Sequence, residues 1–187
     1  MIRFDYNGYI GRGPWARIIL RDLANNCQFD ESLFIAEDIC WNIDVLRKAE
    51  RVGLMKNIWY IYSIQPFSIT KSYNPKLFEY IQKGIMSIES RIDKENQKQV
   101  IALLKRIREE IHHLSRSYYS YLANKEKKVF RAEIYEAYPW TLLGEADYVK
   151  KGDREIRFTS MLYRTRLILM YAQIRERLKR FKNSLSK

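Results

Sequence analysis

Two adjacent carboxylates, Glu37 and Asp38, are the residues of this sequence whose type and position best suit chemistry. A helix is expected to begin at this pair, because Ile39, Ile43 and Leu46 follow at spacings of four and three residues. The helix dipole favours acids in a first turn, so capping explains the pair when it is taken alone. A carboxylate held ionised and in a fixed direction can also take a proton from an attacking hydroxyl.

The segments around the acid pair occur in an order that adds a second interpretation. They are W-A-R-I-I-L-R at 15–21 and F-D-E-S-L at 29–33 before the pair, and Y-I-Y at 60–62 and S-I-T at 68–70 after it. Together with Glu37 and Asp38, this run of about sixty residues resembles the acceptor-side half of bacterial family 2 glycosyltransferases, which have the GT-A fold.

The resemblance implies the inverting transfer of a sugar from a nucleotide-sugar to a cell-surface glycan acceptor. By this resemblance Asp38 is the base that takes the proton of the acceptor hydroxyl. The residues expected to bind the acceptor or to support the base are Glu37, Trp15, Arg17, Trp41 and Ser68. Trp15 and Trp41 could stack on a sugar ring, and they are also explained as core residues.

The sequence departs from the family pattern in one respect that bears on catalysis. A complete member carries a nucleotide-binding half that ends in an acid-x-acid motif for a divalent metal. The acid-x-acid in this chain, Glu145-Ala146-Asp147, follows Asp38 and is interpreted as a solvated helix face. We therefore expect no metal site or cofactor in this chain, and Mg or Mn only with a complementary N-terminal half. The chain is expected to be a truncated or split transferase with little activity alone, because metal stabilisation of the leaving diphosphate is absent.

The first 75 residues mix short elements, and they are expected to form an α/β remnant with few strands. Ile18, Ile19 and Leu23 predict a short helix within 15–23, and Gly53 is expected to close the helix that begins at the acid pair. The alternating residues at 58–63 predict a strand.

Residues 76–187 are expected to form a helical extension, which makes the chain predominantly helical overall. Two apolar stripes predict an antiparallel helical hairpin joined at 93–96, a third helix is expected at 125–138, and a single last helix is expected from Arg154 to Leu185. The stripes of the hairpin are Phe78, Ile81, Ile85, Ile88 and Ile92, then Val100, Leu103, Ile107, Ile111, Leu114 and Tyr118.

The net charge of +12 belongs to this second part. Residues 1–75 carry 9 basic and 8 acidic side chains, whereas 76–187 carry 25 and 14. The last helix has one apolar face, made of Leu167, Met170, Ile174, Leu178 and Phe181. Its candidate membrane-contacting or anion-contacting residues are Arg175, Arg177, Lys179, Arg180 and Lys182. The helix could pack on the domain, lie on an anionic membrane or bind nucleic acid; nucleic acid is least favoured, because no nucleic-acid-binding signature accompanies it.

Cys27 and Cys40 are expected to be free thiols, because their spacing does not suit a metal and no signal peptide is evident. No apolar run reaches the roughly 18 residues of a membrane span. We expect a cytoplasmic protein with peripheral contact at the inner face of the plasma membrane. Its expected partners are a glycan acceptor and a complementary transferase half or a second copy. The alternative is a non-catalytic basic helical module that binds anionic membrane, an acidic partner or nucleic acid.

Overall fold

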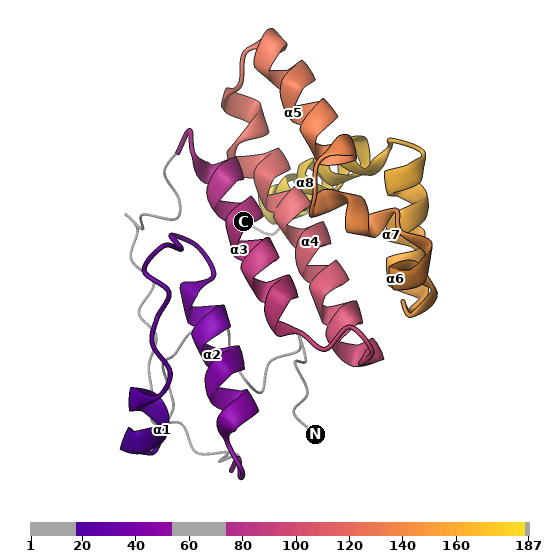
Figure 1. Cartoon of the computed structure of the whole chain (residues 1–187). Helices are drawn as coiled ribbons and strands as arrows, with labels where there is room; N and C mark the ends of the chain where they lie inside the picture. The colour runs from indigo at the N-terminus through magenta and orange to yellow at the C-terminus, as the bar shows by residue number, and fades with distance from the viewer. Residues whose placement is uncertain (1–17, 54–73, 186–187) are drawn as a thin grey trace.

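The structure of the chain is a computed structural model that describes residues 18–53 and 74–185, and every regular element in these ranges is helical (Figure 1). The prediction of a predominantly helical chain is confirmed for these ranges. The predicted strand at 58–63 lies outside the described residues, and so do Trp15, Arg17 and Ser68.

The first described range contains α1 (Arg21–Asn25) and α2 (Glu37–Lys48). The helix predicted within 15–23 begins later than expected, at Arg21, and Ile18 is exposed rather than part of a helical apolar face. The helix at the acid pair begins where predicted, but the prediction that it reaches Gly53 is wrong. Ala49 already has an extended backbone, since the polar residues that follow are exposed and gain nothing by continuing the helix.

The predicted hairpin is present as α3 (Leu77–Arg91) and α4 (Gln97–Ser117), which lie side by side in Figure 1. The Asn96 side chain caps α4 by accepting the backbone N–H groups of Lys98 and Gln99. Both apolar stripes are largely buried where the helices meet, as the 3.6-residue period requires.

Helix α4 is central to the remaining elements, because α3, α7, α8 and two short 3₁₀ segments all contact it. Those segments are η2 (Tyr119–Tyr121) and η3 (Trp140–Leu143). They flank α5 (Asn124–Glu136), which takes the place of the helix predicted at 125–138. The fully buried Trp140 ring stacks on Phe78 at a centroid distance of 5.5 Å, and Phe130 meets Phe78 edge-on.

The prediction of a single last helix from Arg154 to Leu185 is wrong, because two separate helices take its place, α7 (Arg154–Arg164) and α8 (Ile168–Leu185). A short helix, α6 (Ala146–Lys150), precedes them. Between α7 and α8, Arg166 takes a left-handed backbone with φ 58°. The N–H of Leu167 bonds to the Leu162 carbonyl at 2.8 Å, and the N–H of Arg166 bonds to the Tyr163 carbonyl at 2.9 Å. This pair of hydrogen bonds is a Schellman motif, which ends α7 and turns the chain so that α8 packs on α4.

The main apolar core joins both described ranges. Ala36, Cys40 and Ile43 at α2 belong to the same buried cluster as the apolar faces of α3 and α4. A smaller cluster, made of Cys27, Trp41 and Val45, lies between α2 and the segment before it. The division into domains at residue 75 stays a prediction.

Candidate functional site

The acid pair lies in the first turn of α2, next to a tight entry into the helix. Ala36 precedes the pair with a left-handed backbone, φ 73°, which is uncommon for a residue with a Cβ atom. One carboxylate oxygen of Asp38 accepts the N–H of Ile39 at 2.7 Å. Both acids are partly exposed, so the structure presents two carboxylates at a helix N-terminus that solvent reaches.

Helix α3 supports this entry at Gly84. A Cβ atom at Gly84 would lie 2.7 Å from the carbonyl oxygen of Ile35 and 3.1 Å from the Cβ of Ala36. The missing side chain therefore lets the turn before α2 lie directly on α3. Gly84 thus helps to set the position of Asp38, although it is 46 residues away in the sequence.

Polar contacts between α2 and α3 fix the two helices further along. Arg91 of α3 forms an ion pair with Asp44 of α2 at 3.0 Å and donates to the Ser87 carbonyl at the same distance. The Cys40 thiol lies 3.5 Å from the Ser87 hydroxyl. Burial raises the pKa of this thiol, so it stays protonated and is no nucleophile at neutral pH. These contacts hold α2 in place. Because the Cys40 thiol is protonated, the carboxylates at the N-terminus of α2 are the groups of this helix best suited to accept a proton from a substrate.

Trp41 is a core residue in this structure, one of the two interpretations of its sequence position. It is 8% exposed, its indole N–H donates to the Cys27 carbonyl at 2.6 Å, and Phe29 stacks on one ring face at 4.9 Å. The structure therefore brings Glu37, Asp38 and Trp41 together on one helix. The stacking of an acceptor sugar on Trp41 stays a prediction.

Sequence reasoning did not single out Gly84 and Arg91, which support α2 from α3, or Asp44, the partner of Arg91 on α2. A glycine inside an otherwise regular apolar stripe is a signal of close approach and could have indicated Gly84. The Asp44–Arg91 pair joins residues 47 positions apart and has no local signature.

The described ranges contain no group of three or more His, Cys, Asp or Glu side chains that could hold a metal ion. Glu145 and Asp147 are exposed at α6, as expected for a solvated helix face. The two cysteines are free and buried. The expectation that Mg or Mn binds only with a complementary half stays a prediction.

The predicted contact residues of the last helix separate into groups. Arg175 and Arg177 are exposed, and the charge of Arg175 acts on Glu109 and His112 of α4. Burial and the neighbouring Glu110 raise the pKa of Glu109 to about 7. Burial, followed by the charges of Arg175 and other arginines, lowers the pKa of His112 to about 4. The side chains of Lys179, Arg180 and Lys182 lie outside the described part of the structure.

The predicted apolar face of α8 is exposed, and other residues make the contact with α4. Ile168, Leu169 and Ala172 are buried, at 1%, 5% and 0% exposure. The exposed face, here called the α8 stripe, consists of Leu167 at 41%, Met170 at 53%, Ile174 at 47%, Leu178 at 60% and Phe181 at 63%. Among the described residues, no helix is both long and apolar enough to span a membrane.

Comparison with known proteins gives one informative similarity. Over 72 residues the chain is 38% identical to a Bacillus subtilis (strain 168) protein named "uncharacterized glycosyltransferase EpsJ". The match covers 37% of this chain and 21% of the B. subtilis protein, so it spans about a fifth of the length of that relative. No family model matches the chain. No solved structure matches it significantly. The chain is thus similar, over part of its length, to a protein named as a glycosyltransferase.

Proposed function

We propose that this chain supplies the acceptor side of a glycosyltransferase of family 2 with the GT-A fold, and that Asp38 is its catalytic base. The reaction is the inverting transfer of a sugar from a nucleotide-sugar to the hydroxyl of a cell-surface glycan. The observation that carries the proposal is the partly exposed carboxylate pair at the start of α2, in a chain similar to a protein named as a glycosyltransferase.

The position of Asp38 suits a base. The dipole of α2 favours the ionised carboxylate at its N-terminus, and the bond from the Ile39 N–H orients one oxygen. A carboxylate in this position can accept the proton of an acceptor hydroxyl as that hydroxyl attacks the anomeric carbon. Glu37, together with Trp15, Arg17 and Ser68, is proposed to bind the acceptor or to support the base.

The donor side is proposed to come from a complementary half that binds the nucleotide-sugar and a divalent metal. That metal would neutralise the leaving diphosphate. We assign the described residues of this chain to the acceptor side.

Replacement of Asp38 by Asn tests the base assignment. Sugar transfer is measured in the smallest assembly that is active, either this chain alone or this chain with the nucleotide-binding half. We expect kcat to fall by about 10²–10⁴-fold while binding of the nucleotide-sugar is unchanged, because only proton removal is lost.

Asp22→Asn is the matched control, since Asp22 is an exposed acid at the start of α1 and its replacement removes the same charge. This variant should transfer sugar like the wild type. An Asp38→Asn variant with unchanged turnover would refute the role of Asp38, and equal losses in both variants would show a general effect of charge.

A second candidate function is association with an anionic membrane, and the exposed α8 stripe favours it. A helix with aliphatic residues on one face and arginines beside them can lie in the plane of the headgroups. This function is compatible with the first, because a transferase that builds cell-surface glycans would meet its acceptor there. It also stands alone as the role of a non-catalytic module.

A further inference from the structure

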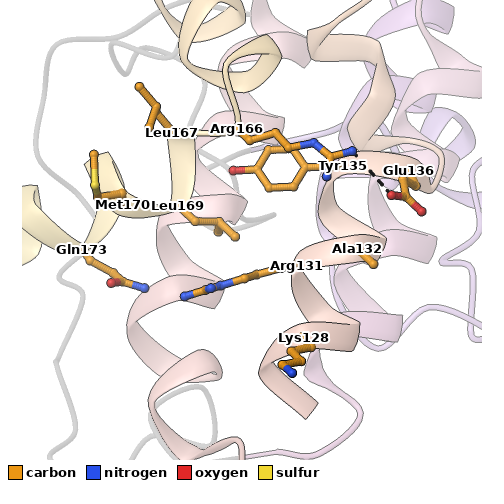
Figure 2. Close-up of a pocket in the computed structure, with 10 residues that line it drawn as sticks. All are labelled: Lys128, Arg131, Ala132, Tyr135, Glu136, Arg166, Leu167, Leu169, Met170 and Gln173. Carbon is orange, nitrogen blue, oxygen red and sulfur yellow. Dashed lines mark ion pairs between the residues drawn. The ribbon is translucent and has the colours of Figure 1, made fainter. Parts of the chain in front are cut away.

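A cleft lies between α5 and the start of α8, with a volume of about 560 Å³ (Figure 2). Its α5 wall contains Lys128, Arg131 and Tyr135. Its other wall contains Leu167, which directly precedes α8, and Met170 and Gln173 of α8. Figure 2 shows the ends of Arg131 and Gln173 pointing toward one another across this α5–α8 cleft. The cleft is separate from the acid pair, because α2 contributes no residue to its lining.

The cleft carries more positive than negative charge. Lys128, Arg131 and Arg166 line it, against Glu136 alone. Glu136 lies 3.6 Å from Arg166, and both side chains are more than 60% exposed, so this pair neutralises the site weakly. Arg131 donates to the Tyr119 hydroxyl at 2.6 Å and keeps further N–H groups for a ligand. The described residues provide no ion pair to Lys128. An anion is therefore the ligand that this lining favours.

Tyr135 adds a phenol ring to the cleft wall. Its hydroxyl is buried and points toward α8 in Figure 2, where the backbone of Leu169 lies close to it.

The cleft borders the α8 stripe directly. Met170 belongs to both, and Ile174 and Leu178 follow it at successive four-residue steps along the same helix face. Arg177 lies four residues after Gln173, so it continues the cleft side of the stripe, and it is exposed. Cations and exposed aliphatic side chains thus lie next to one another where the cleft meets the stripe.

We propose that this surface binds an anionic phospholipid membrane, with a lipid phosphate in the α5–α8 cleft and the α8 stripe at the boundary of the acyl chains. The inference rests on the proposed membrane association and assigns it a headgroup site. A lipid fits both the cleft and the stripe, because its phosphate matches the cations and its hydrocarbon matches Leu, Met and Ile. A nucleic acid would pair with the cations and leave the aliphatic side chains in water.

Flotation with vesicles tests the proposal with the full chain. The vesicles contain phosphatidylcholine alone or phosphatidylcholine mixed with phosphatidylglycerol. The wild type should favour the mixed vesicles, and Lys128→Gln with Arg131→Gln should weaken that binding about 30-fold, because each cation near the surface contributes on the order of a fivefold gain. Binding of Ile174→Asn with Leu178→Asn should fall on both vesicle types.

Matched controls separate the cleft from general charge. Lys83→Gln with Arg154→Gln removes two exposed cations of α3 and α7 that do not line the cleft. This double variant should bind far better than the cleft variant. Lys128→Glu is a second cleft variant in case the loss of the Arg131–Tyr119 contact impairs folding, which circular dichroism reports.

Three results would overturn the proposal in distinguishable ways. A wild type that binds neither vesicle, or both equally, would refute an anionic membrane surface. Equal losses in the cleft and control variants would refute the cleft and leave membrane association standing. Cleft variants that lose binding to a single-stranded oligonucleotide while binding vesicles normally would assign the cations to nucleic acid. None of these results bears on sugar transfer by Asp38.

Discussion

At the scale of single residues, the direction of Asp38 depends on a backbone that is costly to form. Ala36 holds a left-handed conformation just before α2, which costs a residue with a Cβ about 1–2 kcal/mol. Gly84 offsets that cost, because the turn at residues 35–36 can lie against the bare backbone of α3. The start of α2 is thus set by contact with another helix and not by its own capping, since Ala36 provides no side-chain cap.

Replacement of Gly84 by Ala should therefore destabilise the protein. Alanine gains about 1 kcal/mol over glycine inside a helix, but its Cβ would lie 2.7 Å from a backbone carbonyl that cannot rotate away. We expect a net loss of about 1–2 kcal/mol in the free energy of unfolding in urea, together with reduced sugar transfer.

Gly53→Ala is the control for that measurement, because a Cβ at Gly53 would meet nothing within 4 Å. Its free energy of unfolding should stay close to that of the wild type. A Gly84→Ala variant as stable as the wild type would show that α3 and the turn separate without cost, and Gly84 would then have no positioning role.

The sequence predicts the place of the acid pair but not its support. Local periodicity is sufficient to start a helix at Glu37, because spacing and charge are properties of the segment itself. The contacts of Gly84 and of Arg91 join residues about 47 apart, and no local pattern encodes them. Trp41 had two interpretations for a related reason, since an aromatic residue suits a core and a sugar site equally.

At the scale of elements, α4 carries two titratable groups on the side that meets α7 and α8, and their pKa values are shifted in opposite directions. His112 is 8% exposed, and its ring nitrogens have no hydrogen-bond partner among the described residues. Burial lowers its pKa to about 4, whereas burial and Glu110 raise the pKa of Glu109 to about 7. Each group is thus favoured in its neutral form between these values.

The two groups should have opposite effects on stability as the pH falls. The lowered pKa of His112 means that the unfolded chain takes up a proton first, so stability is lost as the pH falls from about 6.5 to about 4. The raised pKa of Glu109 means that the folded chain takes up a proton first, so stability is gained as the pH falls through about 7.

Urea unfolding at about pH 7.5 and at about pH 5 should separate the effect of His112 on stability from that of Glu109. Compared with the wild type, His112→Gln should gain stability on acidification and Glu109→Gln should lose it. The same change with pH in all three proteins would show that neither group has a shifted pKa in the fold.

The break between α7 and α8 shows what an element-level prediction from sequence misses. Arginine is a good helix former, and apolar residues continue through the break with helical spacing, so one helix from Arg154 to Leu185 was the consistent expectation. Glycine usually marks a Schellman motif, and here Arg166 occupies its left-handed position. The packing of Ile168 and Leu169 on the core stabilises the turn, and this contact is visible only in the tertiary structure.

At the scale of the whole molecule, one apolar core around α4 holds the described ranges together. Ile107, in the middle of α4, is fully buried, and the same core includes Cys40 and Ile43 of α2. The apolar stripes predicted the part of this core that α3 and α4 form, because apolar residues at helical spacing lie on one face of a helix and that face is buried. The membership of α2 was not predictable, since it depends on which face of α2 meets α3.

Truncation at the centre of this core should affect the entire molecule. Ile107→Ala should reduce the free energy of unfolding by about 2–5 kcal/mol, because it leaves a cavity in a site with no access to water. Circular dichroism and tryptophan fluorescence should report one common transition, since Trp140 and α2 share the core. Ile18→Ala, at a position 79% exposed, should change the free energy little. Two separate transitions would instead support a domain boundary near residue 75.

The α8 stripe faces outward because of its rotation about the helix axis relative to the buried residues of α8. Ile168, Leu169 and Ala172 anchor the first turns of α8 on the core, and each later residue adds 100° of rotation. Deletion of one residue between Ala172 and Ile174 would turn the remainder of the helix by that angle and redirect Ile174 and Leu178 while leaving composition and net charge almost unchanged. The number of residues between the turn at Arg166 and a given side chain therefore determines whether that side chain faces outward from α8. A related sequence with an insertion or deletion in this segment would expose different side chains.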